Sequence, residues 1–148
     1  LVNKNILKKP VLYLSDFFEN NKTTYYDNLM RVRTHDDIKQ WLKFFLVGVI
    51  ETAKKAVNTF DEILKLKKHS ELSIQTLGPR ANNAQKILEY LLKRPIVDAK
   101  KIVEITGVSN RTSYNLINDL LEIGILNEIT GGQRGKAYTF KKYLNLFK

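Results

Sequence analysis

The chain has 148 residues, of which 43% are apolar, so it can bury a hydrophobic core and could form one domain or two small ones. A formal net charge of +10 indicates anionic partners, nucleic acid first and a membrane surface second, although many basic domains carry their charge for solubility alone. The absence of cysteine excludes disulfides and thiolate metal sites and suits a reducing cytoplasm.

The charge is spread over the whole chain. Residues 1–80 hold 14 basic and 9 acidic side chains, and residues 81–148 hold 11 and 6, so each part carries +5. No apolar run reaches 18 residues, so we expect no membrane-spanning helix and no membrane partner. The first residue is a leucine with no signal-peptide pattern, which leads us to expect a piece of a longer chain.

Three helices are predicted in the first seventy residues. Pro10 suits the start of the first, because proline fits the first helical turn. Thr23 or Thr24 can start the second, and Asp36 or Asp37 can cap the third. This part of the chain, residues 1–70, is predicted to be all α.

The third helix is predicted to be long and to continue to about Lys67. Thirty helical residues would reach roughly 45 Å, more than the width of a small domain. Its first half is apolar nearly all round and so needs packing partners on several sides. The repeating apolar positions are Ile38, Leu42, Phe45, Val49, Ala53, Ala56, Phe60 and Ile63.

A domain boundary is predicted in residues 71–80, because the helical pattern stops there and Gly78-Pro79 would break a helix. The second domain, residues 81–148, then begins with a helix from Ala81 to Lys93 that Pro95 halts.

A second and third helix follow in this domain, joined by a tight turn. Residues 98–105 form a short amphipathic helix that ends at Gly107. Ser109 stands where an N-cap belongs, the next helix runs from Asn110 to about Ile123, and Gly124 closes it.

Two strand-like runs, residues 125–130 and 136–140, then flank the glycine-rich segment 131–135. Three helices and a basic hairpin are typical of a winged helix-turn-helix, which often lays its second motif helix in the major groove of DNA. The predicted fold class is therefore mainly α, with one long helix followed by a winged helix-turn-helix.

The candidate DNA contacts lie on the exposed face of this helix and on the hairpin. Arginine pairs with guanine and asparagine with adenine in the major groove, and the helix start and the hairpin could hold phosphates. A docking module for protein remains open, since Arg111 is the only basic residue of the helix and Asp119 and Glu122 follow it. Sequence-specific binding would favour a dimer. The candidate contacts are Ser109, Asn110, Arg111, Thr112, Tyr114, Asn115, Asn118, Gln133, Arg134 and Lys136.

Catalytic and metal-binding patterns are missing from the sequence. It contains no glycine-rich phosphate loop, no H-E-x-x-H and no G-x-S-x-G. His35 and His69 are far apart and flanked by polar residues, so we expect no metal site. The aromatic residues Tyr25-Tyr26 and Trp41 to Phe45 could stack on a base, but aromatic side chains at helical spacing favour a core.

Three blocks of the first domain together resemble Fic-domain proteins, in the order and spacing of that family. They are Ile6-Leu7-Lys8-Lys9-Pro10-Val11-Leu12-Tyr13-Leu14-Ser15-Asp16-Phe17-Phe18-Glu19, then Tyr25-Tyr26-Asp27-Asn28-Leu29 with Val32-Arg33, and Trp41-Leu42-Lys43-Phe44-Phe45-Leu46-Val47-Gly48-Val49. The C-terminal runs 124–131 and 138–144 resemble the winged helix of one branch of the family. The hairpin departs from it, with Arg134-Gly135-Lys136 where the family tends to show two arginines around an asparagine.

The resemblance implies the C-terminal portion of a protein that transfers AMP from ATP, with Mg²⁺, to a hydroxyl of a target protein. The motif that performs this reaction, H-P-F-x-[DE]-G-N-G-R, is absent from the sequence, so we expect no catalysis by this chain alone. In the intact protein the resemblance places Tyr25, Tyr26 and Leu29 near the adenine side of a nucleotide pocket.

We also expect a homodimer or a rearranged helical packing. Without the central helix of the Fic domain, the apolar faces of residues 12–18 and 41–49 would be exposed. The alternative is a DNA-binding regulator of the bacterial winged-helix kind that dimerises through its N-terminal helices.

Overall fold

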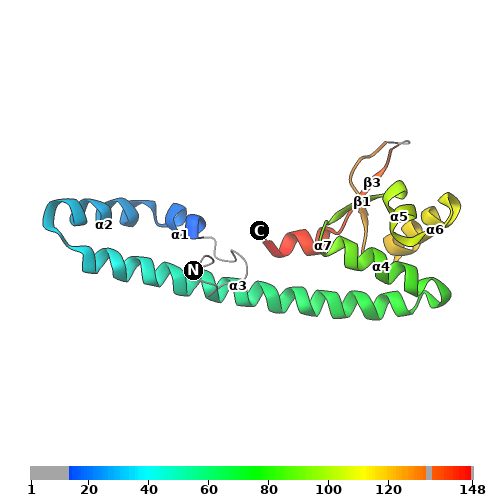
Figure 1. The fold of residues 1–148 in the computed structure, drawn as a ribbon, viewed down its shortest axis with the longest axis horizontal. Coiled ribbons are helices and arrows are strands. Elements are labelled where there is room, and N and C mark those ends of the chain that lie inside the picture. Colours follow the sequence, from blue (N-terminus) through cyan, green and yellow to red (C-terminus); the bar gives the residue numbers. More distant parts are fainter. Residues whose placement is uncertain (1–13, 133–134, 148) are drawn as a thin grey trace. The chain divides into compact units, whose positions relative to one another are not determined.

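The computed structural model describes residues 14–132 and 135–147 and divides the chain into two compact units, Leu1–Phe60 and Asp61–Lys148 (Figure 1). The predicted fold class is confirmed at the coarse level, because the described residues are mainly helical with one small antiparallel sheet. None of the helices in these two described ranges combines the length and the apolar character that a membrane crossing requires.

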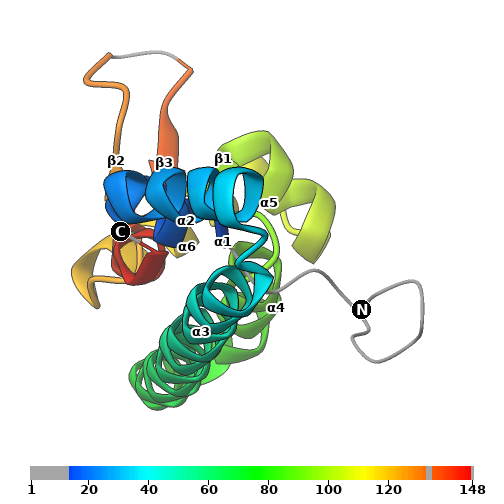
Figure 2. The same cartoon turned by 90° about the vertical axis from the view of Figure 1, so that its left-hand side faces the viewer.

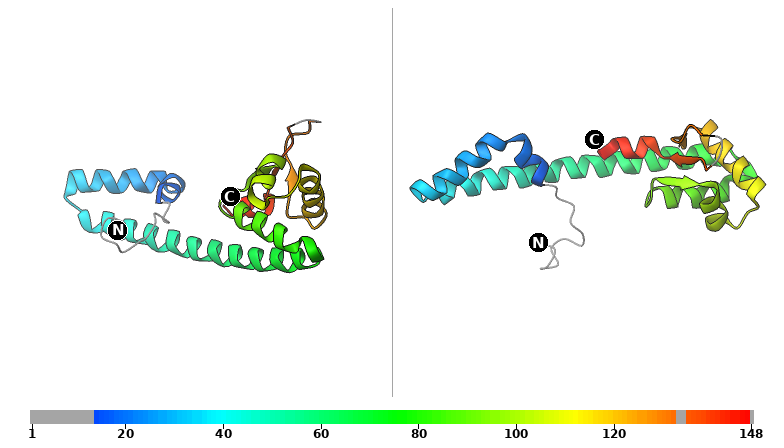
Figure 3. Two further views of the ribbon diagram at one scale, coloured as in Figure 1. Left: turned by 45° about the vertical axis from the view of Figure 1, so that its right-hand side comes forward. Right: turned by 90° about the horizontal axis from the view of Figure 1, so that it is seen from above.

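The first unit consists of α1 (Leu14–Asn20), α2 (Lys22–His35) and the first part of α3 (Ile38–Gln75). Helices α1 and α2 run alongside the first part of α3 (Figure 3). Asp37 caps α3 as predicted, since its Oδ1 accepts the Gln40 backbone N–H at 3.3 Å. The predicted start at Pro10 lies outside the described residues.

Aromatic side chains hold this unit together. Phe17 lies 5.2 Å from Phe44 between ring centroids, and Phe18 lies 6.3 Å from Trp41. These four side chains are half-buried against one another, so the expectation of exposed faces at residues 12–18 and 41–49 is wrong for them. Other apolar residues of α3 are exposed instead, among them Leu42 and Leu46.

Helix α3 extends to Gln75, so its predicted end near Lys67 is wrong, and residues 71–75 of the expected linker are helical. The continuation of α3 beyond Lys67 is hard to recognise in the sequence because most of the residues there are polar. Ser70 and Ile74, one helical turn apart, are buried in the second unit, and Lys67 pairs with Glu71 at 3.6 Å. The helix therefore continues beyond its regular apolar repeat because residues of its last two turns are buried in the second unit.

The second unit contains the end of α3, three further long helices and the sheet. The helices predicted at 81–93, 98–105 and 110–123 are confirmed within a residue or two. The elements are η2 (Gly78–Arg80), α4 (Ala81–Leu91), β1 (Ile96–Asp98), α5 (Ala99–Thr106), α6 (Asn110–Glu122), β2 (Asn127–Glu128), β3 (Ala137–Thr139), α7 (Lys141–Leu144) and η3 (Asn145–Phe147).

The sheet has the order β1-β3-β2 and is antiparallel throughout, and Figure 2 shows β2 and β3 leading into the hairpin. Strand β1 was not predicted. It pairs Val97 with Tyr138, and the Phe140 backbone N–H donates to the Pro95 carbonyl at 2.9 Å. Asp98 ends this strand and caps α5 through a 2.7 Å bond from the Lys101 N–H, rather than starting the helix as expected.

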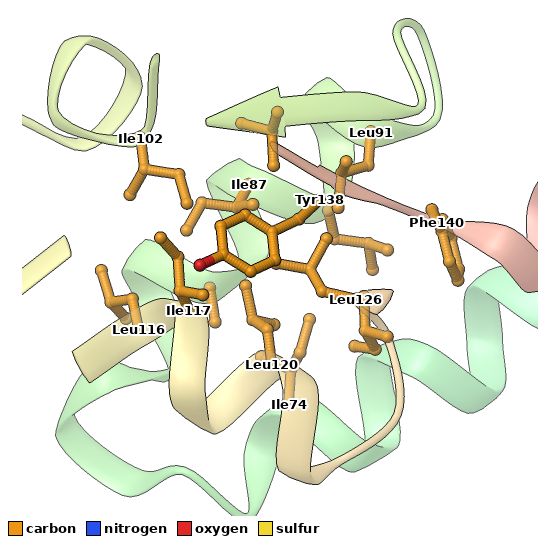
Figure 4. Close-up of a cluster of buried hydrophobic side chains, with 14 residues drawn as sticks. Ile74, Ile87, Leu91, Ile102, Leu116, Ile117, Leu120, Leu126, Tyr138 and Phe140 are labelled. Carbon is orange, nitrogen blue, oxygen red and sulfur yellow. The ribbon is translucent and has the colours of Figure 1, made fainter. Parts of the chain in front are cut away.

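One hydrophobic core joins these elements. Figure 4 shows the ring of Tyr138 among side chains of α3, α4, α5 and α6, with Leu126 and Phe140 in the same cluster. Burial raises the pKa of the Tyr138 hydroxyl above its ordinary value, because the charged form would lose its hydration in the core. The fully buried members on α6 are Leu116, Ile117 and Leu120, which fixes the side of the helix that faces inward.

A substitution at Gly48 tests the packing of the first unit. A Cβ at this buried position would lie 2.6 Å from Cδ1 of Phe17, which no relaxed contact allows. Overpacking costs about 1–3 kcal/mol, while alanine is favoured over glycine in a helix by about 1 kcal/mol. We expect Gly48→Ala to lower the free energy of unfolding of this unit by up to about 2 kcal/mol in urea denaturation.

The double variant Gly48→Ala/Phe17→Leu is the control. The smaller side chain gives the added methyl group room, so the double variant should lose less stability than the sum of the two single variants. Additive losses would contradict a close approach of Phe17 to α3.

Candidate nucleic-acid interface

The start of α6 is fixed by a capped turn. Gly107 adopts the left-handed region with φ 72° and ends α5, and two residues later Ser109 caps α6. The Thr112 backbone N–H donates to Ser109 Oγ at 3.2 Å, and the two hydroxyl oxygens lie 2.9 Å apart. The predicted N-cap is confirmed, and both side chains are engaged in the cap.

The inward face of α6 decides which side chains face outward. Ser113 is fully buried, and its hydroxyl donates to the Asn110 carbonyl at 2.7 Å. With Leu116, Ile117 and Leu120 also buried, five of the predicted contact residues are exposed together. They are Asn110, Arg111, Tyr114, Asn115 and Asn118.

This exposed face is rich in amides and carries one guanidinium group. Three asparagine side chains offer paired donors and acceptors, and Arg111 offers a planar fork of donors. Tyr114 is 54% exposed and presents an aromatic ring between them. We therefore define the α6 face as Asn110, Arg111, Tyr114, Asn115 and Asn118. Its groups match the hydrogen-bonding edges of base pairs rather than a purely phosphate-binding surface.

Of the three hairpin residues predicted to contact DNA, Lys136 is the one that lies in the part of the chain that the structure describes. Gln133 and Arg134 lie outside the described residues. Lys136 Nζ lies 3.0 Å from Glu128 Oε2 across β2 and β3, and this hydrogen bond raises the pKa of Lys136. Lys136 is thus a charged group already paired within the hairpin.

An ion pair that the sequence did not predict ties α6 to the start of α4. Arg80 Nη1 lies 2.9 Å from Asp119 Oδ2, and the Asp119 side chain is only 13% exposed. Asp119 Oδ2 has no hydrogen-bond partner among the described residues, so its contact with Arg80 is one of charge. In the sequence, Asp119 follows Arg111 as an acidic residue of the same helix. Its charge is balanced by Arg80, and no local pattern links two residues so far apart in the chain.

The residues expected at a nucleotide pocket do not share one environment in the first unit. Tyr25 packs against Trp41 at 5.6 Å and is half-buried, whereas Tyr26 and Leu29 are exposed. A shallow hollow lies beside them on α2, but none of the three lines it. Its lining residues are Thr24, Asp27, Asn28, Met30, Arg31, Thr34 and Gln40.

No known family model matches this chain. In the two ranges that the structure describes, histidine, aspartate and glutamate side chains nowhere gather in threes that could hold a metal ion. The α6 face of the second unit, with its exposed amides and guanidinium group, is the candidate functional surface.

Removal of the Ser109 cap tests how the α6 face is supported. Ser109→Ala leaves the Thr112 N–H without its partner, and loss of an N-cap costs about 1 kcal/mol. We expect thermal denaturation to show that loss, and Ser109→Asp to restore most of it because aspartate caps equally well. Equal stability of Ser109→Ala and the unchanged chain would contradict the cap.

Removal of Arg80 tests the ion pair. Arg80→Ala should lower the free energy of unfolding by about 1 kcal/mol, a modest value because Arg80 itself is half exposed. In the double variant Arg80→Ala/Asp119→Asn the orphaned carboxylate is gone, so part of the loss should be recovered. A double-mutant cycle by urea denaturation measures the coupling, and a coupling of zero would contradict the pair.

Proposed function

We propose that the second unit is a winged helix-turn-helix that binds duplex DNA, with α6 in the major groove. Three features support this: the order of α4, α5 and α6, the short capped turn between α5 and α6, and the antiparallel β2–β3 hairpin that follows. In proteins of this kind the second motif helix reads base edges while neighbouring elements touch phosphates.

The α6 face is the single observation that carries the proposal. Arginine donates two hydrogen bonds to guanine, and asparagine both donates to and accepts from adenine. These groups stand on the N-terminal part of a helix whose opposite face is buried, so they project together. Tyr114 could contact the thymine methyl group through its ring. The net charge of +10 supplies attraction to phosphates of any sequence.

The family resemblance extends the proposal to the whole chain. We propose that this is the C-terminal portion of a Fic-type protein, in which a separate motif would transfer AMP from ATP to a target protein. Tyr25, Tyr26 and Leu29 would then belong to the nucleotide site of the intact protein. An in-frame H-P-F-x-[DE]-G-N-G-R in the coding DNA shortly before Leu1 would support this, and its absence would overturn it.

A regulator that pairs through its N-terminal helices is the second candidate. The exposed apolar residues of α3, such as Leu42 and Leu46, favour it because a face of this kind calls for a partner. Both candidates share the DNA-binding second unit, and they differ in whether an AMP-transfer motif stands upstream.

Arg111→Ala tests reading by α6. A DNA sequence selected from a random pool should bind the unchanged chain far better than a scrambled duplex at physiological salt. Loss of a paired contact to guanine costs about 1–3 kcal/mol, so the preference for the selected sequence should fall about ten- to hundredfold in fluorescence anisotropy.

Arg33→Ala is the matched control, because it removes the same charge from an exposed position of α2 in the other unit. It should weaken binding to both duplexes equally and leave their ratio unchanged. If both variants behave alike and binding follows salt alone, groove reading is wrong and the unit is better explained as a protein-docking module.

A further inference from the structure

An apolar stripe runs along one side of α3. It consists of Leu42, Leu46, Ile50, Ala53, Val57 and Phe60, and we call it the α3 stripe. Each of its five large side chains is at least half exposed. All six residues lie within the first unit. Large apolar side chains rarely line up in water on one helix without a partner.

The helices of the first unit do not cover this stripe. Gly48, Trp41 and Phe44 of α3 receive Phe17 and Phe18 from α1, and by helical geometry they lie on the other side of the helix. The stripe therefore remains open while the aromatic side of α3 is occupied.

The spacing of the stripe fits a second copy of the same helix. From Leu46 onward it repeats at 4-3-4-3, the spacing with which helices pack side by side. The stripe of one copy is also complementary to the stripe of a second copy that runs in the opposite direction. When two copies lie antiparallel about a two-fold axis, Leu42 faces Phe60, Leu46 faces Val57, and Ile50 faces Ala53. Large side chains therefore face each other at the two ends of the stripe, and the small side chain of Ala53 lies near the two-fold axis.

The charges beside the stripe favour the same arrangement. Lys43 and Asp61 are exposed and lie about five helical turns apart, so both stand on the same flank of α3. Lys54 is exposed on this flank between them and, in the register above, lies beside Ile50 of the other copy. In an antiparallel pair a two-fold axis brings equal flanks together, which places Lys43 of each copy beside Asp61 of the other. A parallel pair would bring this flank against the opposite one, where Val49, Ala56 and Ile63 carry no charge.

The stripe supplies the apolar centre of a dimer interface. From Leu42 to Phe60 it spans about 28 Å of helix, and a stable interface buries roughly 800 Å² on each partner. Its five large side chains, each at least half exposed, would form the centre of such an interface, with the flanking residues of α3 around them. We propose that two copies of this chain pair antiparallel through the α3 stripe. The pairing deepens the second candidate function, a regulator that dimerises through its N-terminal helices, by naming the surface and its direction. Its test contains no DNA, so it can fail separately from DNA binding.

Cysteine cross-linking tests both the surface and its direction, because the chain has no cysteine of its own. Under mild oxidation the double variant Leu42→Cys/Phe60→Cys should form a covalent dimer, whereas Leu42→Cys and Phe60→Cys alone should not. Efficient cross-linking of Leu42→Cys alone would mean a parallel pair and overturn the proposal. Sedimentation as a monomer at about 100 µM would overturn the proposal as well. So would binding to phosphatidylserine vesicles that depends on the stripe, if no dimer forms.

Charge reversal tests the proposed pairing of Lys43 with Asp61. Both side chains are exposed in the single chain, so these variants should still fold. Lys43→Glu should raise the dimer dissociation constant several-fold, and Lys43→Glu/Asp61→Lys should return it towards the original value. Lys55→Glu is the matched control, since Lys55 is exposed on the far side of α3. An equal effect of Lys43→Glu and Lys55→Glu would contradict the antiparallel register. Leu46→Lys places a charge within the stripe itself and should abolish the dimer, and an unchanged dimer would overturn the proposal.

Discussion

The burial of one face of α6 is the constraint on which the second unit depends. Leu116, Ile117 and Leu120 are fully buried in the core that Tyr138 and Phe140 complete. Since successive residues of a helix are rotated by about 100°, a turn of α6 by a single residue would bring polar side chains inward and expose apolar ones. The core therefore also determines which amides stand outside. The candidate surface is rigid because it is the back of a packed helix.

Local signals made much of this unit predictable, and distant contacts explain what was missed. Ser109 and Gly107 mark helix ends within a few residues of sequence, so α5 and α6 could be placed. Strand β1 is three residues long and exists through its pairing with residues far along the chain, which no local pattern reveals. The contact of Arg80 with Asp119 is hidden for the same reason. As a result, the outward residues of α6 could be predicted, but the electrostatic state of their neighbours could not.

The first unit shows a different limit. Periodicity identified α3 as an apolar helix, but it could not say which of its apolar residues would be covered. Trp41 and Phe44 are half-buried, whereas Leu42 and Leu46 between and beyond them are exposed, although all four are apolar. The difference arises from Phe17 and Phe18, which approach α3 from one side where Gly48 leaves room. The room at Gly48 thus lets α1 pack on one side of α3, and the other side stays exposed.

Pairing of charges within the second unit bears on how it would discriminate among partners. Asp119 is balanced by Arg80 and Lys136 by Glu128, while Arg111 makes no ion pair among the described residues. The selective chemistry of the α6 face thus rests on three amides and one guanidinium group. Hydrogen bonds of amides to base edges are screened little by salt, whereas attraction between phosphates and the diffuse positive charge falls steeply with it. On a DNA partner, added salt should therefore weaken binding overall while leaving the preference for one sequence largely intact. A merely basic surface would also bind more weakly, but it would show no sequence preference at any salt concentration.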